Sequence, residues 1–358
     1  MKKNVNAPLA NRSETKVAVI GGSGYVGEEL VRLLLQHPYA DLAAVTSRQF
    51  AGKTLADIFP RLSHHQKAGD IRFGASNPAQ LAQMAQVIFL ALPHGFAAEF
   101  TKPLVQTGAR IVDLSADFRI KDPKIYKEFY GNDHSAPDLL GEAVYGLPEI
   151  YRAEISHANL VACPGCYPTS ILLPLLPLIR EKVVSLASIL VTSLSGVTGA
   201  GRKVETDYLF AECNESIRPY GVPKHRHLSE IEEQLSAFAG KKVTIQFTPH
   251  LVPVNRGIIT TIYVDPSKEI DAGSIATIYQ KAYGDEPFVR LLGAERFPDT
   301  KNVSGTNFID IAWRLDLRTG RAILMSAIDN IVKGASGQAI QCFNLMRGYP
   351  ETTGLQIP

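Results

Sequence analysis

The stretch Lys16-Val-Ala-Val-Ile-Gly-Gly-Ser-Gly-Tyr-Val-Gly27 decides the fold of the N-terminal half of the chain. Its opening run is mostly apolar and β-branched, which is typical of a buried strand, and Glu28–Gln36 after it has helical character. Glycines at positions 21, 24 and 27 allow a tight turn, a close approach of backbone N–H groups to a pyrophosphate, and packing of the helix on the strand. We therefore predict a dinucleotide-binding unit of Rossmann type, and a purely structural glycine turn is the alternative. The predicted cofactor contacts in this turn are Gly21, Ser23, Gly24, Tyr25, Val26 and Gly27.

The residues after the second expected strand, Asp41–Val45, indicate which cofactor binds. Enzymes that use NAD usually place a carboxylate here to bind the ribose 2′-hydroxyl, but this chain has Thr46-Ser47-Arg48 instead. Hydroxyls and a guanidinium suit a 2′-phosphate through charge-assisted hydrogen bonds. We predict NADP(H) as the cofactor, with Ser47 and Arg48 as its selectors, and a solvated loop arginine is the alternative.

Two further apolar runs, Val87–Leu92 and Arg110–Leu114, are expected to extend a parallel sheet that is covered on both faces. In a doubly wound sheet, ligands bind beyond the carboxyl ends of the strands, so the turns after these runs should face the cofactor or the substrate. On this basis we assign Pro93 to the cofactor and Arg119 to the substrate. An internal ion pair is an equally good role for Arg119.

The second half of the chain has runs that are typical of a mixed or antiparallel sheet, at residues 187–192, 242–248, 257–264, 308–313 and 321–326. A closing helix is expected over 329–346. The predicted fold class is α/β, with a Rossmann-type doubly wound parallel sheet and an inserted α+β catalytic domain of mixed sheet. The expected parts are a loose N-terminal extension (1–15), an NADP-binding domain (16–165, completed by a C-terminal helix at 330–358) and a catalytic and dimerisation domain (166–329).

Cys166 is the strongest candidate for a covalent nucleophile. It lies in Cys163-Pro-Gly-Cys-Tyr-Pro-Thr-Ser170, directly ahead of a long apolar run that is expected to be helical. The N–H groups and positive dipole end of that helix would favour a thiolate and lower the pKa of Cys166. A buried structural thiol and half of a metal site are the alternatives. Pro174 and Pro177 should kink or interrupt the helix after two turns.

His225 and His227 are the expected proton-transfer groups. They precede a helix predicted over Leu228–Gly240, with Ser229 and Glu232 as its capping box. The dipole of this helix would keep an imidazole neutral near pH 7, as a base that takes a proton from a thiol requires. Both histidines remain candidates at this point. A solvent-exposed His-x-His pair is the alternative, and no acidic or cysteine cluster accompanies the pair to suggest a metal.

Two loops of the second half, together with Asn330 at the start of the expected closing helix, are expected to bind the substrate or the nicotinamide end of the cofactor. Ser193–Arg202 is rich in small residues, which allow close backbone approach to a ligand, although a flexible connection is the alternative. Pro249–Arg256 joins two expected strands and carries a guanidinium that suits a carboxylate or phosphate. The cofactor residues assigned in these regions are Ser195, Gly196 and Asn330. The substrate residues are Arg202, His250 and Arg256, in addition to Arg119.

Composition points away from several other classes of protein. The 358 residues are enough for two cores of ordinary size, and 45% hydrophobic and 20% charged residues with a net charge of +2 do not suggest disorder or a nucleic-acid surface. Four cysteines are too few and too scattered for a disulfide framework, and they fit a reducing cytoplasm. We expect no metal, no signal peptide and no apolar span of about 20 residues that could cross a membrane.

A nicotinamide-binding domain combined with an activated cysteine narrows the chemistry to hydride exchange at an acyl carbon. In the reduction of an acyl phosphate, Cys166 would displace phosphate to give a thioester, and hydride transfer followed by collapse would release an aldehyde. His225 or His227 would carry the proton, and backbone N–H groups near the helix start could stabilise the oxyanion.

In combination, the motifs resemble those of the N-acetyl-gamma-glutamyl-phosphate reductases. They are Gly21–Gly27, Thr46–Arg48, Asp113–Arg119, Tyr145–Glu149, Cys163–Thr169, Ser195–Arg202, His225–His227 and Asp329–Ala335. The resemblance implies NADPH-dependent reduction of N-acetyl-gamma-glutamyl phosphate to N-acetylglutamate semialdehyde and phosphate, a step of arginine biosynthesis. It also implies the fold of aspartate-semialdehyde dehydrogenase and a cytoplasmic homodimer or homotetramer. The family's nucleophile corresponds to Cys166, and its histidine base to the segment His225–His227.

Two other functions remain open on the sequence. A related acyl-phosphate reductase of lysine biosynthesis would act on an aminoadipyl phosphate attached to a carrier protein, and the small net charge argues mildly against a broad basic surface for such an acidic carrier. A non-catalytic NADP-binding sensor would leave Cys166 unreactive. None of the three functions involves a nucleic acid or a membrane.

Overall fold

The computed structural model describes residues 13–202 and 204–355, and the chain divides into two compact units. The first unit is formed by Met1–Phe118, Ser135–Cys163 and Ser336–Pro358, and the second unit by Arg119–His134 and Pro164–Ala335. The predicted domains stay a prediction, and these two units group 119–134, 164–165 and 330–335 with the second unit. Residues 1–12 of the predicted extension lie outside the described residues, and the first strand already begins at Thr15.

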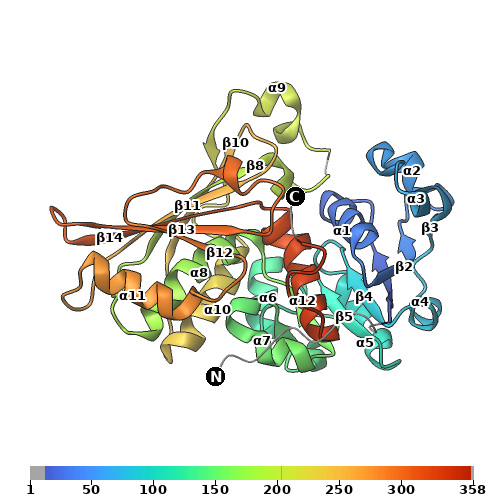
Figure 1. Cartoon of the computed structure of the whole chain (residues 1–358), viewed down its shortest axis with the longest axis horizontal. Helices are drawn as coiled ribbons and strands as arrows, with labels where there is room; N and C mark the ends of the chain where they lie inside the picture. The colour runs from blue at the N-terminus through green and yellow to red at the C-terminus, as the bar shows by residue number, and fades with distance from the viewer. Residues whose placement is uncertain (1–12, 203, 356–358) are drawn as a thin grey trace. The chain divides into compact units, whose positions relative to one another are not determined.

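The first unit is built on a seven-stranded parallel sheet (Figure 1). Along the sheet, the strands lie in the order β3-β2-β1-β4-β5-β7-β6. Their bounds are β1 Thr15–Ile20, β2 Ala40–Thr46, β3 Phe73–Gly74, β4 Val87–Leu90, β5 Arg110–Asp113, β6 Val144–Tyr145 and β7 Leu160–Ala162. The strand order reverses between β1 and β4, which is the switch point where doubly wound sheets bind ligands. The predicted Rossmann-type sheet is confirmed.

Helices cover both faces of this sheet. One face carries α1 (Tyr25–Gln36), α7 (Pro148–His157) and α12 (Gly337–Arg347), and the other carries α4 (Pro78–Met84) and α5 (Ala97–Val105). Two short helices, α2 (Leu55–Ile58) and α3 (Gln66–Asp70), lie between β2 and β3. Because side chains alternate along a strand, burial on both faces requires apolar residues throughout, and Val17–Ile20 of β1 are all fully buried.

The second unit contains a mixed seven-stranded sheet in the order β12-β13-β14-β11-β8-β10-β9. Its strands are β8 Leu190–Gly196, β9 Arg218–Pro219, β10 Gln246–Val252, β11 Ile258–Val264, β12 Val289–Gly293, β13 Ile309–Asp316 and β14 Arg321–Ile328. The pairs β8/β10 and β12/β13 are parallel and the other neighbours are antiparallel, so the predicted mixed sheet is confirmed. The helices α8 (Cys166–Arg180), α10 (His227–Ala239) and α11 (Ala272–Tyr283) lie together on one side of it (Figure 1). The remaining helices of this unit are α6 (Pro123–Tyr130) and α9 (Phe210–Cys213).

The helix α8 is continuous over 15 residues, so the predicted interruption at Pro174 and Pro177 is wrong. Each proline lacks the N–H that would bond to the carbonyl four residues earlier, which leaves the carbonyls of Ser170 and Leu173 without their helical donors. Side-chain hydroxyls from other elements donate to these carbonyls. They are the hydroxyl of Ser326 to Ser170 and that of Tyr283 to Leu173, each at 2.7 Å. Tertiary hydrogen bonds therefore replace the bonds that the prolines remove.

Replacing Tyr283 by Phe should destabilise the protein, because it leaves the buried carbonyl of Leu173 without a donor. The expected loss in the free energy of unfolding is about 1–3 kcal/mol, measured by urea unfolding. The matched control is Tyr263→Phe in β11, because the Tyr263 side chain is 38% exposed and water can replace its contacts. The control should change stability by less than about 0.5 kcal/mol. Equal losses in the two variants would contradict this account of α8.

Candidate active site

The glycine turn after β1 is shaped by close packing. Gly21 has φ +84° and a Cβ there would lie 2.5 Å from the carbonyl oxygen of Ala91, while a Cβ on Gly27 would lie 2.7 Å from the oxygen of Gly21. Gly22 is equally constrained, since its Cβ would overlap a side chain of β2. At Gly24, the N-cap of α1, no described atom lies within 4 Å of an added Cβ. Three glycines thus form the turn, and the fourth leaves room at the N-terminus of the helix, where a phosphate group would fit.

Ser47 and Arg48, the residues predicted to bind the 2′-phosphate of the cofactor, lie near this turn within the first unit. The hydroxyls of Ser23 and Ser47 are 2.9 Å apart, which joins the glycine turn to the end of β2. Arg48 is exposed, with its guanidinium 5.7 Å from the ring centroid of Phe96. Pro93 lies in the turn that follows β4. The end of β2 therefore presents a hydroxyl and a guanidinium, but no carboxylate, beside the glycine turn.

Cys166 is the first residue of α8, and Gly165 is the N-cap of that helix. The N–H of Gly165 donates to the Glu230 carboxylate at 2.9 Å, and the N–H of Tyr167 donates to the Cys166 sulfur. The cysteine thus occupies the helix start that the sequence predicted. The chain's other cysteines are also free thiols, and Cys163 and Cys342 are buried.

The expected lowering of the Cys166 pKa by the helix N-terminus is wrong for the free protein. Burial raises the pKa of this thiol to about 11, and the Glu230 carboxylate acts in the same direction. The N–H of Tyr167 and the charges of Arg119 and Arg226 lower it, but by less than burial raises it. Desolvation of a thiolate outweighs the dipole here, so Cys166 is a neutral thiol near pH 7 and needs a base to become a nucleophile.

His227 is the histidine that lies against the cysteine turn. A Cβ on Gly165 would be only 2.5 Å from Nε2 of His227, so the imidazole packs directly on the residue before Cys166. The side chain is 8% exposed, and its Nδ1 has no hydrogen-bond partner among the described residues. Burial lowers the pKa of His227 well below its usual value, and His225, Arg226 and Arg119 add to this. The imidazole is therefore neutral and able to accept a proton.

His225 has a different environment. Its Nδ1 accepts the backbone N–H of His227 at 3.1 Å, so the proton of the neutral ring is on Nε2. Its ring is packed between Tyr167, Tyr220 and Phe247, with centroid distances of 5.4, 5.5 and 5.6 Å. Burial and the neighbouring Arg226 lower the pKa of His225 to about 4. One ring nitrogen of His225 is thus committed to the start of α10, and its predicted part in proton transfer stays a prediction.

The predicted capping box of Ser229 and Glu232 is wrong. The helix α10 begins at His227 with Arg226 as its N-cap, so Ser229 already lies in the first turn. Its hydroxyl donates to the Arg226 carbonyl at 2.8 Å, while the Glu232 carboxylate accepts the N–H of Ile245 at 3.0 Å. The helix therefore starts at the histidine itself.

Glu230 is a buried charged residue of this site that the sequence analysis missed. It is fully buried, accepts the N–H of Gly165, and forms an ion pair with Arg119 at 3.3 Å. The only sequence signal was its position three residues after His227, which places both on one face of α10. Arg119 is 7% exposed and lies in an internal ion pair, but with Glu230, a partner that the sequence analysis did not name. Its predicted contact with substrate stays a prediction.

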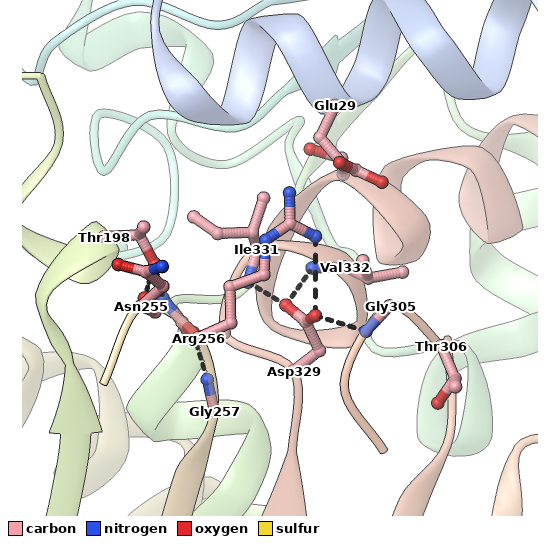
Figure 2. Close-up of polar contacts among 12 residues, drawn as sticks. Glu29, Thr198, Asn255, Arg256, Gly257, Gly305, Thr306, Asp329, Ile331 and Val332 are labelled. Atoms are coloured by element: carbon pink, nitrogen blue, oxygen red, sulfur yellow. Dashed lines mark hydrogen bonds and ion pairs between the residues drawn. The ribbon is translucent and has the colours of Figure 1, made fainter. Parts of the chain in front are cut away.

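The remaining predicted residues of the second unit lie at the ends of β8, β10 and β14. Asn330 accepts the N–H of Gly257 at 2.7 Å and donates to Thr198 Oγ1 at 3.0 Å. Arg256 is 25% exposed and approaches the Asp329 carboxylate at 3.5 Å (Figure 2). Asp329 was also missed, although it begins both the expected closing helix and a quoted motif. Asn330 thus ties the loop after β8 to the turn before β11.

Four other residues of the predicted site lie on β8, on β10 or in the loop after β8. Ser195 lies on β8 and is 2% exposed, with a side-chain hydrogen bond to Tyr167, the residue after the candidate nucleophile. Gly196 ends β8, and a Cβ there would lie 2.8 Å from the carbonyl oxygen of Asn255. His250 lies on β10, and its buried Nδ1 has no hydrogen-bond partner in the described part of the chain. Arg202 lies in the exposed loop after β8.

Metal-ligand clusters and membrane-spanning helices are both absent from the part of the chain that the structure describes. Over residues 13–202 and 204–355, no three His, Cys, Asp or Glu side chains are grouped so that they could hold a metal ion. No helix in these ranges has the length and apolar character needed to cross a membrane.

Comparison with known families identifies the chain. Residues 16–158 match the NAD binding domain of semialdehyde dehydrogenases, and residues 166–330 match their dimerisation domain. The chain belongs to the semialdehyde dehydrogenase family. It is 53% identical to an N-acetyl-gamma-glutamyl-phosphate reductase of Akkermansia muciniphila over 345 residues, which are 96% of this chain and 99% of that protein. It is 49% identical to one of Geotalea daltonii over 342 residues, which are 95% and 98% of the two chains. The resemblance found in the sequence is confirmed, and the chain is an oxidoreductase.

Solved structures show the same fold at low sequence identity. Aspartate semialdehyde dehydrogenase II from Vibrio cholerae has a TM-score of 0.71 at 18% identity, covering 93% of this chain and 98% of that chain. Aspartate semialdehyde dehydrogenase with NADP from Candida albicans has a TM-score of 0.69 at 16% identity, covering 93% and 99%. The predicted fold class is confirmed by both likenesses.

Proposed function

We propose that this protein reduces N-acetyl-gamma-glutamyl phosphate to N-acetylglutamate semialdehyde with NADPH and releases phosphate, in arginine biosynthesis. The observation that carries the proposal is the junction of α8 and α10. There a cysteine begins one helix, and a neutral, buried histidine at the start of the other packs on the preceding glycine. Relatives that are about half identical over nearly their whole length are named as reductases of this substrate.

Cys166 acts as the nucleophile and His227 as its base. Because both groups are neutral in the free protein, the imidazole takes the thiol proton as sulfur attacks the acyl carbon. The carbon–oxygen bond to phosphate then breaks and a thioester remains. After hydride reaches the thioester carbon, the carbon–sulfur bond breaks, the aldehyde carbonyl forms, and the imidazolium of His227 returns its proton to sulfur. The net reaction consumes one NADPH and one proton, and the departing phosphate takes up that proton from solvent.

NADP(H) would supply the hydride when bound, and residues of the first unit suit its phosphates. The open space at Gly24 and the N-terminus of α1 fit a pyrophosphate, and Ser47 and Arg48 fit a 2′-phosphate. We assign Ser23, Tyr25, Val26, Pro93, Ser195, Gly196 and Asn330 to the same cofactor. For the substrate, Arg256 is half-buried and Arg202 exposed, so each could present a guanidinium to a carboxylate or phosphate.

We further propose a homodimer or homotetramer in the cytoplasm. Support for self-association comes from the match of residues 166–330 to a family described as a dimerisation domain. Support for the compartment comes from the four free cysteines, because thiols persist where the environment is reducing.

Steady-state kinetics with purified protein test the proposed reaction. We expect NADPH to be oxidised only when N-acetyl-gamma-glutamyl phosphate is present, with phosphate and semialdehyde formed in equal amounts. The second assay offers an aminoadipyl phosphate attached to its carrier protein. No turnover of the first substrate at millimolar concentration, or faster turnover of the second, would exclude the assignment to arginine biosynthesis.

Replacing Arg48 by Ala tests the choice of cofactor. The guanidinium is expected to form charge-assisted hydrogen bonds to the 2′-phosphate, and their loss should lower kcat/KM for NADPH by about 10-fold to 100-fold, equivalent to about 1.5–3 kcal/mol. The value for NADH, which has no 2′-phosphate, should change by less than about threefold. Arg72→Ala, an exposed arginine of the same unit that bonds to the Gly52 carbonyl, is the control. An unchanged preference for NADPH would remove Arg48 from the site.

A further inference from the structure

Asp329 is a fully buried carboxylate that the proposed reaction does not use directly. Its Oδ1 accepts the N–H groups of Ile331 at 2.7 Å and Val332 at 3.0 Å. Its Oδ2 accepts the N–H of Gly305 at 2.6 Å and approaches the guanidinium of Arg256 at 3.5 Å (Figure 2). Burying a carboxylate is destabilising unless hydrogen bonds or opposite charges replace its lost hydration. Here four donors surround the Asp329 side chain.

These donors come from three separate segments of the second unit. Gly305 precedes β13, Arg256 precedes β11, and Ile331 and Val332 follow β14. Figure 2 shows the carboxylate at the point where the three segments meet. Asp329 therefore holds the end of β14 in place relative to its neighbours.

The segment after Asp329 runs directly to the nucleophile. Val332–Ser336 is a π-helical turn, and the N–H of Gly334 bonds to the Asp329 carbonyl at 2.9 Å. A Cβ on Gly334 would lie 2.7 Å from Cβ of Cys166 and 3.1 Å from its Cα. The backbone of Gly334 thus packs against the cysteine so closely that no side chain fits between them. Short π-helical turns are found mostly where a local backbone position matters for function.

We propose that Asp329 is a positioning residue, which holds Gly334 against Cys166 and thereby fixes the direction of the thiol. This role rests on the proposed function of Cys166 as the nucleophile. It needs glycine at position 334, because any Cβ would displace either the cysteine or the turn. It also needs a carboxylate at position 329, because an amide can accept through only one of its two atoms and would turn its NH₂ toward donors.

The proposal is tested with Asp329→Asn and Gly334→Ala, singly and together. Each single variant should lower kcat by about 10-fold to 100-fold, because small displacements of a reacting group have effects of this size. For Gly334→Ala, KM should stay within about threefold, since this substitution leaves the proposed substrate residues unchanged. Asp329→Asn also weakens the ion pair to Arg256, a proposed substrate residue, and is therefore judged by kcat alone. The double variant should lose clearly less than the product of the single losses, because a displaced turn no longer forces the alanine methyl onto Cys166.

A readout that does not depend on the reductase reaction separates this proposal from the proposed function. Iodoacetamide labelling, followed by peptide mass spectrometry, gives the rate at Cys166 relative to the partly exposed Cys213. In Gly334→Ala this ratio should fall at least about threefold, because the methyl fills space beside the thiol. The wild-type protein could lack reductase activity while Gly334→Ala still lowers the labelling ratio. That result would contradict the proposed function and still support the contact between Gly334 and Cys166.

Matched controls are Asp271→Asn, the N-cap of α11, and Gly273→Ala in its first turn, where an added Cβ comes no closer than 3.5 Å to another residue. Neither should change kcat or the labelling ratio. The proposal is overturned if a folded Gly334→Ala protein has wild-type kcat and a wild-type labelling ratio, or if the double variant shows the full product of losses. If either single variant fails to fold, the other decides by the same kcat criterion.

Discussion

Replacing Cys166 by Ser will lower kcat for the reduction of N-acetyl-gamma-glutamyl phosphate by about three orders of magnitude or more. A hydroxyl is a poorer nucleophile than a thiol. It would also form an oxygen ester, and an oxygen ester accepts hydride less readily than a thioester does. Binding of NADPH, followed by its fluorescence, should be unchanged. The substitution is nearly isosteric, so a loss of activity cannot be attributed to a collapsed site.

Cys213→Ser is the matched control for this experiment. Cys213 is also partly buried, and its sulfur makes only a long contact of 3.9 Å to the backbone carbonyl of Tyr208, so its replacement by serine removes no strong interaction. Its kcat should remain within about twofold of wild type. If Cys166→Ser kept a tenth or more of the activity, the thioester mechanism would be excluded.

The raised pKa of Cys166 should make the rate of thiol labelling in the wild-type protein depend on pH. Because the pKa is about 11, the thiolate fraction of the free protein is small at pH 7 and increases with pH. The rate of iodoacetamide labelling at Cys166 should therefore rise about ninefold between pH 9 and pH 10, where the rate at a thiol of ordinary pKa rises by less than about twofold. A plateau below pH 8 would show that the helix N-terminus dominates after all.

Replacing His227 by Asn is the second change with a large expected effect. Removal of the base that takes the proton of Cys166 should lower kcat by about 10² to 10⁴. The comparison is with His225→Asn, which removes the other imidazole but keeps an oxygen that can accept the N–H of His227. That variant should keep kcat within about fivefold and lose stability instead, by about 1–3 kcal/mol, because a buried ring is lost from the aromatic cluster. The opposite pattern would assign the base to His225.

The low pKa values of the two histidines determine the signs of the pH effects. Burial keeps the pKa of His227 well below its usual value, so the ring stays in its basic form as the pH falls through 6.5. Its protonation should therefore reduce kcat/KM only below the pH range in which an ordinary histidine titrates. For His225, the pKa is about 4 in the folded protein and near 6.5 when unfolded. Its contribution to stability is therefore complete above pH 6.5 and is lost as the pH falls from 6.5 toward 4. His225→Asn should flatten this part of the stability profile, measured by urea unfolding at several pH values.

Features that depend on residues adjacent in the sequence could be predicted from the sequence alone. The glycine turn of 21–27 follows from local backbone requirements, and the strand β1 before it from four consecutive buried apolar residues. The start of α8 at Cys166 and the absence of a carboxylate after β2 are likewise readable from short segments. These local patterns were sufficient for the fold class, the family and the nucleophile candidate.

Features that depend on distant residues were decided only by the tertiary structure. The continuity of α8 requires donors from Tyr283 and Ser326, which are more than 100 positions away in the chain. The pKa of Cys166 reverses its expected direction because other elements bury the thiol. His225 and His227 are alike in sequence but differ in which atoms surround each ring. Desolvation and hydrogen bonding are set by what packs against a group, and residues far apart in sequence supply that packing here.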